Sequence, residues 1–206
     1  MFPSSAQVYG SGPADSRALT EDLPLRPVEP YAASKAAGEH ICLAAHHTLG
    51  HHCVIARAFN HIGPAQDTRF AIASFARQLA QIAAGAQPPC IDVGNLEAER
   101  DFLDVRDVVR AYVLLAERGK GGEVYNVCSG VPRKIKELLR ILIMQAGVAV
   151  EVREDPQRMR AGEIPRFYGD NAKLRALGWQ PQISLDESLR DVWDAARAAT
   201  QAGAPT

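Results

Sequence analysis

Two patterns of apolar positions divide the chain into predicted strands and helices. Short strand candidates lie at 53–59, 90–93, 100–104, 123–128 and 148–152, and the first of them is a β-branched, apolar run typical of a buried strand. Stretches with apolar residues at helical spacing lie at 31–49, 70–84, 105–117, 135–146, 171–177 and 184–199. Strands that alternate with helices of about three turns predict an α/β protein with a parallel sheet.

The segments between these elements carry signals for ends and turns. Pro30 suits a first helical turn, where a backbone N–H has no partner, and Gly50 follows the same helix as a C-cap. Residues 60–69 are expected to form a loop, and residues 201–206 a frayed end. Residues 1–10 resemble the end of an element, with small residues followed by Val8 and Tyr9.

The composition excludes several classes of protein. Lys and Arg total 23 against 24 Asp and Glu, so the net charge of -1 argues against binding to nucleic acid through its phosphates. No apolar run reaches the roughly 18–20 residues of a membrane span. The first residues lack the basic and apolar regions of a secretory signal. Four widely spaced cysteines without a CxxC pair predict reduced thiols and a cytoplasmic protein.

The strongest candidate chemistry lies in Ser5, Tyr31 and Lys35. Tyr31 and Lys35 are four residues apart on one predicted helix, so they share a face. An ammonium favours the ionised form of a neighbouring phenol, and such a phenol can move a proton at a carbonyl or alcohol oxygen. A serine hydroxyl at a strand end could bind the same oxygen. The spacing alone is weak, because an exposed Tyr–Lys pair also produces it.

Several motifs follow one another in the order found in the extended short-chain dehydrogenase/reductases. They are SSAQVYG, PYAASK, RAFNHIGP, RDFLDVRDVV and VYNVCSG, and the chain resembles this family over essentially its whole length. Within the family, VGNLEAERDFLDVRDVV and RMRAGEIPRFYGDNAKLRALGW most resemble the GDP-mannose 4,6-dehydratases and the GDP-4-keto-6-deoxy-mannose reductases.

The resemblance implies a role for each of the three residues and a cofactor, NAD or NADP. Ser5 matches the catalytic Ser/Thr, Tyr31 matches the acid/base, and Lys35 matches the lysine that tunes the tyrosine and holds the nicotinamide ribose. In this family, hydride moves between the nicotinamide and a sugar carbon while the tyrosine moves the proton.

Gln7 separates the subfamilies. The resemblance places it where the 4,6-dehydratases carry a glutamate and the epimerase/reductases a cysteine. Elimination of water requires a group that exchanges a proton, and a glutamine amide does not do so at useful pH. The chain therefore matches a reductase, with Gln7 lining the substrate site as a neutral hydrogen-bonding group.

The resemblance also implies residues that bind a GDP-linked deoxy-sugar. Arg100 and Arg160 match arginines suited to phosphate oxygens, and Glu163 lies at the Arg-x-x-Glu spacing of the GDP-mannose enzymes. Asn60 matches an asparagine that contacts substrate beside the nicotinamide. Arg158 could take the role of Arg160, and arginines with solvated heads are the alternative for all three.

No metal site is expected. His46, His47, His51, His52 and Cys53 crowd one helix end, but structural zinc needs four converging ligands and neighbours on a helix point in different directions. They are interpreted as polar residues on an exposed helix end.

The fold implied is the C-terminal part of a doubly wound Rossmann-type sheet with a smaller α/β substrate-binding domain. Residues 1–60 are expected to be the remaining part of the nucleotide-binding domain, and 61–206 mainly the substrate-binding domain, with a return to the sheet around 100–128. The function implied is the nicotinamide-dependent reduction of a GDP-4-keto-6-deoxy-hexose to a GDP-6-deoxy-sugar of the GDP-rhamnose type. The alternatives are a GDP-mannose 4,6-dehydratase and an inactive truncated homologue that only binds nucleotide sugar.

The sequence contains no GxGxxG or GxxxxGK[ST] motif to hold a pyrophosphate. Since this turn and further strands precede the serine motif in the family, the chain is expected to be an N-terminally truncated fragment that binds cofactor weakly and tends to aggregate. Family members commonly dimerise through the helix that carries Tyr31 and Lys35, which implies a homodimer. No nucleic-acid or membrane partner is expected.

Overall fold

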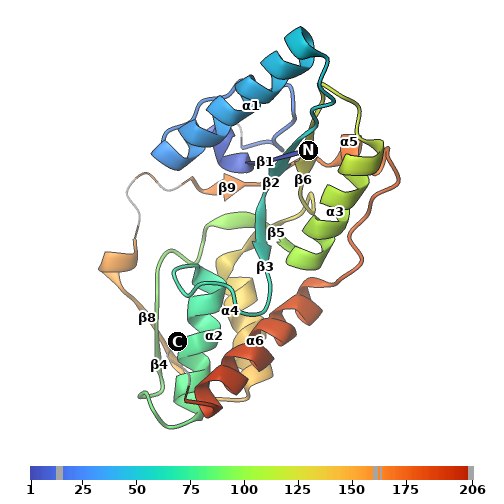
Figure 1. Cartoon of the computed structure of the whole chain (residues 1–206). Coiled ribbons are helices and arrows are strands. Elements are labelled where there is room, and N and C mark those ends of the chain that lie inside the picture. Colours follow the sequence, from blue (N-terminus) through green and yellow to red (C-terminus); the bar gives the residue numbers. More distant parts are fainter. Residues whose placement is uncertain (13–15, 160–161, 163, 204–206) are drawn as a thin grey trace. The chain divides into compact units, whose positions relative to one another are not determined.

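The chain forms two compact units. The computed structural model describes residues 1–12, 16–159, 162 and 164–203 (Figure 1). Unit 1 comprises Met1–His61, Arg100–Pro132 and Arg166–Gln182, and unit 2 comprises Ile62–Glu99, Arg133–Pro165 and Ile183–Thr206. Each unit is therefore assembled from three separate segments of the sequence.

Unit 1 is built around a three-stranded parallel sheet in the order β1-β2-β6. Its strands are β1 (Phe2–Ser5), β2 (Ile55–Ala58) and β6 (Val124–Val127). Ser5 lies opposite Ala58, and Ala58 opposite Val127, so the three strands end at the same edge. The prediction of an α/β protein with a parallel sheet is confirmed, and residues 1–10 contain β1 followed by the short helix η1 (Ala6–Tyr9).

The helices of unit 1 cover this sheet on both faces. They are α1 (Pro30–Leu49), α3 (Val105–Arg118) and α5 (Ala172–Arg175). Successive residues of a strand point to opposite faces. Ala56 and Ala58 of β2 join a buried cluster with Ala111 and Leu115 of α3, whereas Arg57 points to the other face and contacts α1. Figure 1 shows α1 next to β1, the edge strand.

Shorter strands follow the loops of the sequence. They are β3 (Asn60–Ile62), β5 (Glu99–Asp104), β7 (Pro132–Lys134) and β9 (Arg166–Phe167), and β9 pairs with β5. The expected loop at 60–69 is wrong at its start, because residues 60–62 are extended and paired. Three residues that include Asn60 and His61 are too short and too polar to show a strand pattern.

Unit 2 consists of three helices and a two-stranded parallel sheet. The helices α2 (Ala71–Ala83), α4 (Ile135–Ala146) and α6 (Leu185–Gln201) pack on one another. The strands β4 (Cys90–Val93) and β8 (Glu151–Glu154) pair, and η2 (Pro156–Arg158) follows. The helices bury residues at helical spacing: Ile72, Phe75, Leu79, Leu138, Leu142, Leu189 and Val192.

The strand expected at 148–152 lies three residues further along. Gly147 ends α4 in the left-handed conformation, with φ 66°, and the chain pairs with β4 only from Glu151, which lies opposite Cys90. The partner strand and not the apolar run sets where β8 begins. The amide of Gln78 reinforces β4 by bonding the backbone of Asp92 in both directions, at 3.1 and 2.9 Å.

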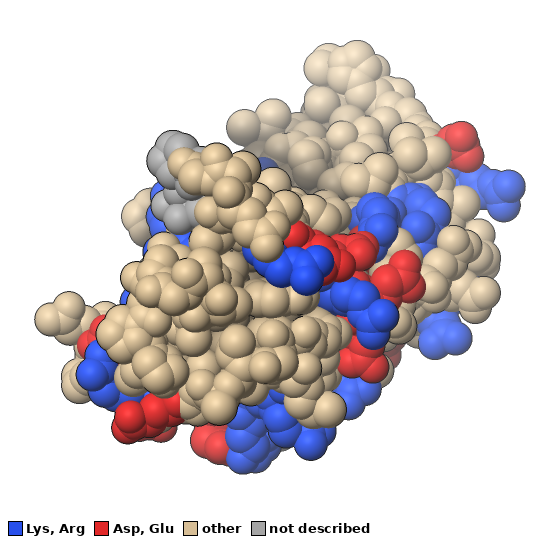
Figure 2. Space-filling model, turned by 90° about the horizontal axis from the view of Figure 1, so that it is seen from below, with Lys and Arg blue, Asp and Glu red and all other residues tan. Residues whose placement is uncertain are grey.

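Charges of both signs share the surface. On the face in Figure 2, basic and acidic side chains lie next to one another and do not form a patch of one sign. Among the helices of the described residues, none is both long and apolar enough to cross a membrane.

Gly10 permits the turn after η1, and its replacement tests this constraint. It adopts φ 62° and ψ -131°, and a Cβ there would lie 2.0 Å from the carbonyl oxygen of Arg26. Gly10→Ala should lower the free energy of unfolding by about 2–4 kcal/mol, because backbone strain and a displaced Arg26 add together. Urea unfolding measures the loss.

Gly50→Ala is the matched control. Gly50 also has positive φ, 71°, but a Cβ there meets nothing within 4 Å. This variant should lose only about 1–2 kcal/mol from strain. Equal losses in the two variants would show that the approach of Arg26 is not a constraint.

Candidate functional site

The first part of the site is the end of β1. Ser5 is the last residue of this strand and the N-cap of η1, with an extended backbone. Its Oγ accepts a hydrogen bond from the backbone N–H of Gln7 at 3.2 Å. A serine hydroxyl has one proton to donate in addition to its acceptor lone pairs. The cap therefore orients the hydroxyl and leaves its proton for another partner.

The second part is the first turns of α1. Tyr31 follows Pro30 and is 51% exposed. One turn later, the ammonium of Lys35 donates to the carbonyl oxygen of Pro3 at 2.8 Å. The Lys35 Nζ also lies 5.8 Å from the centre of the Tyr31 ring and 5.5 Å from that of Phe2. Lys35 thus joins the helix that carries Tyr31 to the strand that ends at Ser5.

These contacts bring the three predicted catalytic residues to one end of the sheet. An exposed phenol, a nearby ammonium and a capped serine hydroxyl form a donor set that can bind an oxygen and give it a proton. In parallel α/β sheets, ligands bind outside the carboxyl ends of the strands, and Ser5 ends β1 there. The catalytic roles of Ser5, Tyr31 and Lys35 remain predictions.

Three further predicted residues lie in unit 1. Gln7 is exposed in η1, two residues after Ser5. Asn60 begins β3, and its amide donates to the backbone carbonyl of Asp101 at 3.2 Å. Arg100 is half-buried in β5. Asn60 and Arg100 are therefore linked through the backbone of Asp101.

Arg160 and Glu163 lie outside the described residues. Arg158, the alternative to Arg160, is in η2 of unit 2 and lines a cavity of about 350 Å³. That cavity also contains Arg77, Arg153 and Asp92. Arg153 pairs with Asp92 at 2.7 Å, and Arg158 with Asp155 at 3.3 Å.

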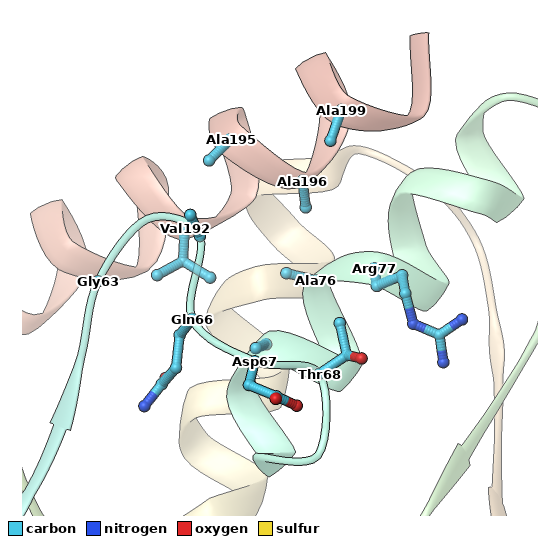
Figure 3. Close-up of a pocket in the computed structure, with 12 residues that line it drawn as sticks. Gly63, Gln66, Asp67, Thr68, Ala76, Arg77, Val192, Ala195, Ala196 and Ala199 are labelled. Atoms are coloured by element: carbon cyan, nitrogen blue, oxygen red, sulfur yellow. The ribbon is translucent and has the colours of Figure 1, made fainter. Parts of the chain in front are cut away.

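A second cavity of unit 2, of about 420 Å³, lies between α2, α6 and the loop that follows β3 (Figure 3). Ala76 and Arg77 of α2 and Ala196 of α6 line it, together with Asp67 and Thr68 of the loop. Of the predicted site residues that the structure describes, none lines this cavity.

The histidine-rich end of α1 is occupied by local contacts. His46 Nδ1 lies 2.7 Å from the carbonyl oxygen of His51, and the His46 ring fills the space beside Gly121 and Gly122. Within the part of the chain that the structure describes, no three His, Cys, Asp or Glu side chains are arranged to hold a metal ion.

The sequence interpretation missed a buried polar cluster next to the site. Glu39 accepts a hydrogen bond from the Ser4 hydroxyl and pairs with Arg57 at 2.7 Å. Arg57 Nη1 donates to the Tyr9 hydroxyl at 3.0 Å, and that hydroxyl donates to Asn126 at 2.7 Å. The available signal was a charged residue in the middle of the apolar run 53–59.

Asp101 is a second organising group that the sequence interpretation missed. Its carboxylate accepts from the backbone N–H groups of Ser129, Gly130 and Gly169, at 2.7, 2.9 and 3.3 Å, and from the Ser129 hydroxyl at 2.6 Å. Burial raises the pKa of Asp101, and these four hydrogen bonds oppose the rise. Asp101 therefore fixes the loop after β6 and the residues after β9 beside Arg100.

Comparisons with known proteins agree with this architecture. The family model described as "GDP-mannose 4,6 dehydratase" matches residues 1–192. The GDP-6-deoxy-D-mannose reductase of Pseudomonas aeruginosa is 44% identical over 193 residues, which are 93% of this chain and 64% of the reductase. A dTDP-glucose 4,6-dehydratase of Streptomyces griseus is 36% identical over 90% of this chain and 55% of its own length.

A solved structure matches closely. RMD from Pseudomonas aeruginosa complexed with NADPH superposes with a TM-score of 0.90 at 43% identity, over 95% of this chain and 65% of that one. This likeness confirms the Rossmann-type α/β fold. The chain spans 55% to 65% of the length of these relatives.

Tyr9 gives the buried cluster a measurable pH dependence. Burial raises the pKa of Tyr9 from 10.0 to about 12, with Arg57 opposing the rise. Because the folded pKa lies above the unfolded one, the stabilisation is complete below pH 10 and is lost as the pH rises through 12. Tyr9→Phe lacks the phenol, so it does not share this loss. The difference in the free energy of unfolding between the parent and Tyr9→Phe should therefore shrink by about 2 kcal/mol over that pH range.

Urea unfolding at a series of alkaline pH values measures this difference. Leu115→Ala is the control, since Leu115 is fully buried and carries no group that titrates. The difference in the free energy of unfolding between this variant and the parent should stay constant across the pH series. A constant difference for Tyr9→Phe as well would show that the Tyr9 phenol does not resist ionisation.

Proposed function

Because the chain belongs to the GDP-mannose 4,6 dehydratase family, we propose that it is a NAD(P)-dependent reductase of a GDP-4-keto-6-deoxy-hexose. The product is a GDP-6-deoxy-sugar of the GDP-rhamnose type. The observation that carries the proposal is the position of Lys35, 5.8 Å from the Tyr31 ring and bonded to the strand that ends at Ser5.

The groups at this end of β1 fit a nicotinamide cofactor. Tyr31 and Lys35 present an O–H donor and an ammonium from the same face of α1. Ribose hydroxyls and a sugar carbonyl are the acceptors that such donors recognise. Lys35 would hold the ribose and Tyr31 would face the sugar, and the bound nicotinamide would supply the hydride.

The proton comes from this chain. Tyr31 donates its phenolic proton to the carbonyl oxygen of the sugar as that oxygen becomes an alcohol. The neighbouring Lys35 charge stabilises the phenolate that remains. Ser5 holds the same oxygen with its hydroxyl proton, because its lone pair already accepts from the Gln7 backbone.

Reduction is favoured over dehydration because of Gln7. Elimination of water needs a further acid/base, and the amide of Gln7 supplies none. Two carboxylates near the end of the sheet already have structural partners. Glu39 pairs with Arg57, and Glu21 accepts from the backbone N–H of Asn126 at 2.8 Å.

The substrate assignment extends to the GDP group. Arg100 and Arg160 are proposed to bind the diphosphate, with Glu163 on the guanine or ribose and Asn60 beside the reacting sugar. Guanidinium groups bind phosphate oxygens in a bidentate manner. The identity to a GDP-6-deoxy-D-mannose reductase supports this choice of nucleotide.

The domain roles and the assembly are also part of the proposal. Residues 1–60 serve the nucleotide-binding domain and 61–206 mainly the substrate-binding domain, with a return to the sheet around 100–128, in a cytoplasmic protein. Two copies pair through α1, since Ala33, Ala37, Ile41 and Ala44 give this helix an exposed, uncharged face. Uncharged helix faces of small residues allow close packing of a second helix.

A direct assay tests the reaction. A GDP-4-keto-6-deoxy-mannose substrate should be reduced with oxidation of NADPH or NADH, whereas GDP-mannose should not be dehydrated. Tyr31→Phe should lower kcat by roughly two orders of magnitude or more, because it removes the proton donor, while GDP binding stays unchanged. The assay uses the 206-residue chain and a chimera completed with the part of the Pseudomonas aeruginosa reductase that the chain does not span.

Two results would contradict the proposal. One is the formation of a 4-keto-6-deoxy sugar from GDP-mannose. The other is a Tyr31→Phe variant that keeps nearly full reductase activity.

Nucleotide binding tests the substrate. GDP should protect the chain against thermal unfolding better than UDP. Arg100→Ala should weaken GDP binding by about ten- to a hundred-fold, because a charge-assisted hydrogen bond is worth about 1.5–3 kcal/mol. Arg118→Ala is the matched control, because Arg118 is exposed at the end of α3. Equal protection by GDP and UDP would remove the guanine assignment, and equal GDP affinity of Arg100→Ala and Arg118→Ala would remove the role of Arg100.

A further inference from the structure

Glu39 lies on the same face of α1 as Tyr31 and Lys35, at the next position of the four-residue spacing. It is fully buried. Its carboxylate accepts from the Ser4 hydroxyl and from Arg57, with Nε at 3.0 and 3.2 Å from the two oxygens and Nη2 at 2.7 Å. Ser4 precedes Ser5 in β1, and Arg57 is in β2. One side chain of α1 is thus bonded to two neighbouring strands.

Apart from Glu39 and from Lys35, which donates to the carbonyl oxygen of Pro3, small residues of α1 face β1. Ala32 and Ala36 are the buried apolar residues of this helix. A Cβ on Gly38 would lie 2.3 Å from the Phe2 ring, so the helix passes very close to the strand. Small side chains allow close approach but provide few projections that interlock. Apolar packing alone therefore leaves the position of α1 along β1 weakly defined.

A buried ion pair contributes little net stability, because the cost of taking both charges out of water offsets their attraction. What such a pair adds is geometry, since the guanidinium fork and the carboxylate bond in one arrangement. Arg57 is itself held in place, as its Nη1 donates to the Tyr9 hydroxyl at 3.0 Å and to the carbonyl of Glu21 at 3.2 Å. Glu39 consequently meets a fixed partner.

We propose that Glu39 is a positioning residue for the reaction, which sets the register of α1 on β1 through Ser4 and Arg57. This inference rests on the proposed function. A slip of one helical turn moves Lys35 by about 5.4 Å, whereas a misplacement of about 1 Å is enough to slow an enzyme severely. The bonds of Glu39 to Ser4 and Arg57 keep Tyr31 and Lys35 at their positions relative to Ser5.

The test replaces the ion pair as a whole. Glu39→Gln alone leaves a buried guanidinium without its partner and can prevent folding. The double variant Glu39→Leu/Arg57→Met keeps apolar volume and leaves Tyr9 bonded to Asn126, so it should fold. Its kcat should fall by roughly ten-fold or more while its KM for the GDP-sugar changes by less than about two-fold, since only transition-state geometry is lost.

A second measurement reads the register without turnover. In the parent chain, nuclear Overhauser contacts should join the Lys35 side chain to the Phe2 ring, whose centre lies 5.5 Å from Nζ. The double variant should lose these contacts. If neither the chain nor the completed chimera shows reductase activity, the proposed function fails, and this spectrum still decides whether Glu39 sets the register.

Leu115→Ala is the control for lost stability. Leu115 is fully buried in the core beneath α3 and does not belong to the cluster around Glu39. Its kcat should stay within about two-fold of the parent under conditions where it is folded. The proposal is overturned if the double variant keeps its Lys35–Phe2 contacts, if its kcat matches that of the parent, or if Leu115→Ala lowers kcat equally.

Discussion

A guanidinium inside the sheet of unit 1 is the interaction on which the rest of this unit depends. Arg57 occupies β2, the middle strand, where neighbours on both sides and helices on both faces exclude water. A charge in that position is tolerated only with complete hydrogen bonding. Glu39, Tyr9 and the carbonyl of Glu21 provide it, and each comes from a different element. Satisfying one buried charge therefore fixes α1, η1 and the segment before α1 around the same strand.

Asp101 applies the same principle to loops. Loop segments expose backbone N–H groups that no neighbouring strand satisfies. The Asp101 carboxylate collects three of them, from two segments distant in sequence, and accepts the Ser129 hydroxyl as well. Burial raises the pKa of Asp101 by more than these hydrogen bonds lower it. Burying the Asp101 carboxylate is unfavourable, but its hydrogen bonds hold a loop beside residues proposed to bind substrate.

Elements with a long repeating pattern were predictable from the sequence, and those defined by a partner were not. The helices α2, α3, α4 and α6 have a regular apolar spacing, and α1 is marked by Pro30 and Gly50 at its ends. Each of the five lies within a few residues of its prediction. Strands of two or three residues such as β3, β7 and β9 have no period to detect, and β8 begins where β4 allows. Local sequence carries propensity, whereas register is decided by the neighbouring strand.

The same distinction holds for the site. Tyr31 and Lys35 were predicted from their spacing on α1 and Ser5 from its motif, and both are local features of the sequence. Glu39 continues that spacing and could have been found in the same way, but its partner Arg57 is distant in sequence. Arg57 interrupts an apolar run with a charge, which is the sequence signal for a buried polar contact, whereas Asp101 follows other charged residues and gives no such signal. The identity of that contact follows only from the fold.

The distribution of carboxylates connects this architecture to the chemistry. A reduction needs one proton donor beside the hydride source, and Tyr31 with Lys35 suffices for that. An elimination needs a second group that is free to change its protonation state during the reaction. Glu39 cannot serve, because losing its charge would leave Arg57 unpaired in the sheet, and Glu21 is engaged by the backbone of β6. With Gln7 neutral, the acids described near the end of β1 are committed to holding the fold, which leaves the phenol of Tyr31 as the group that moves a proton.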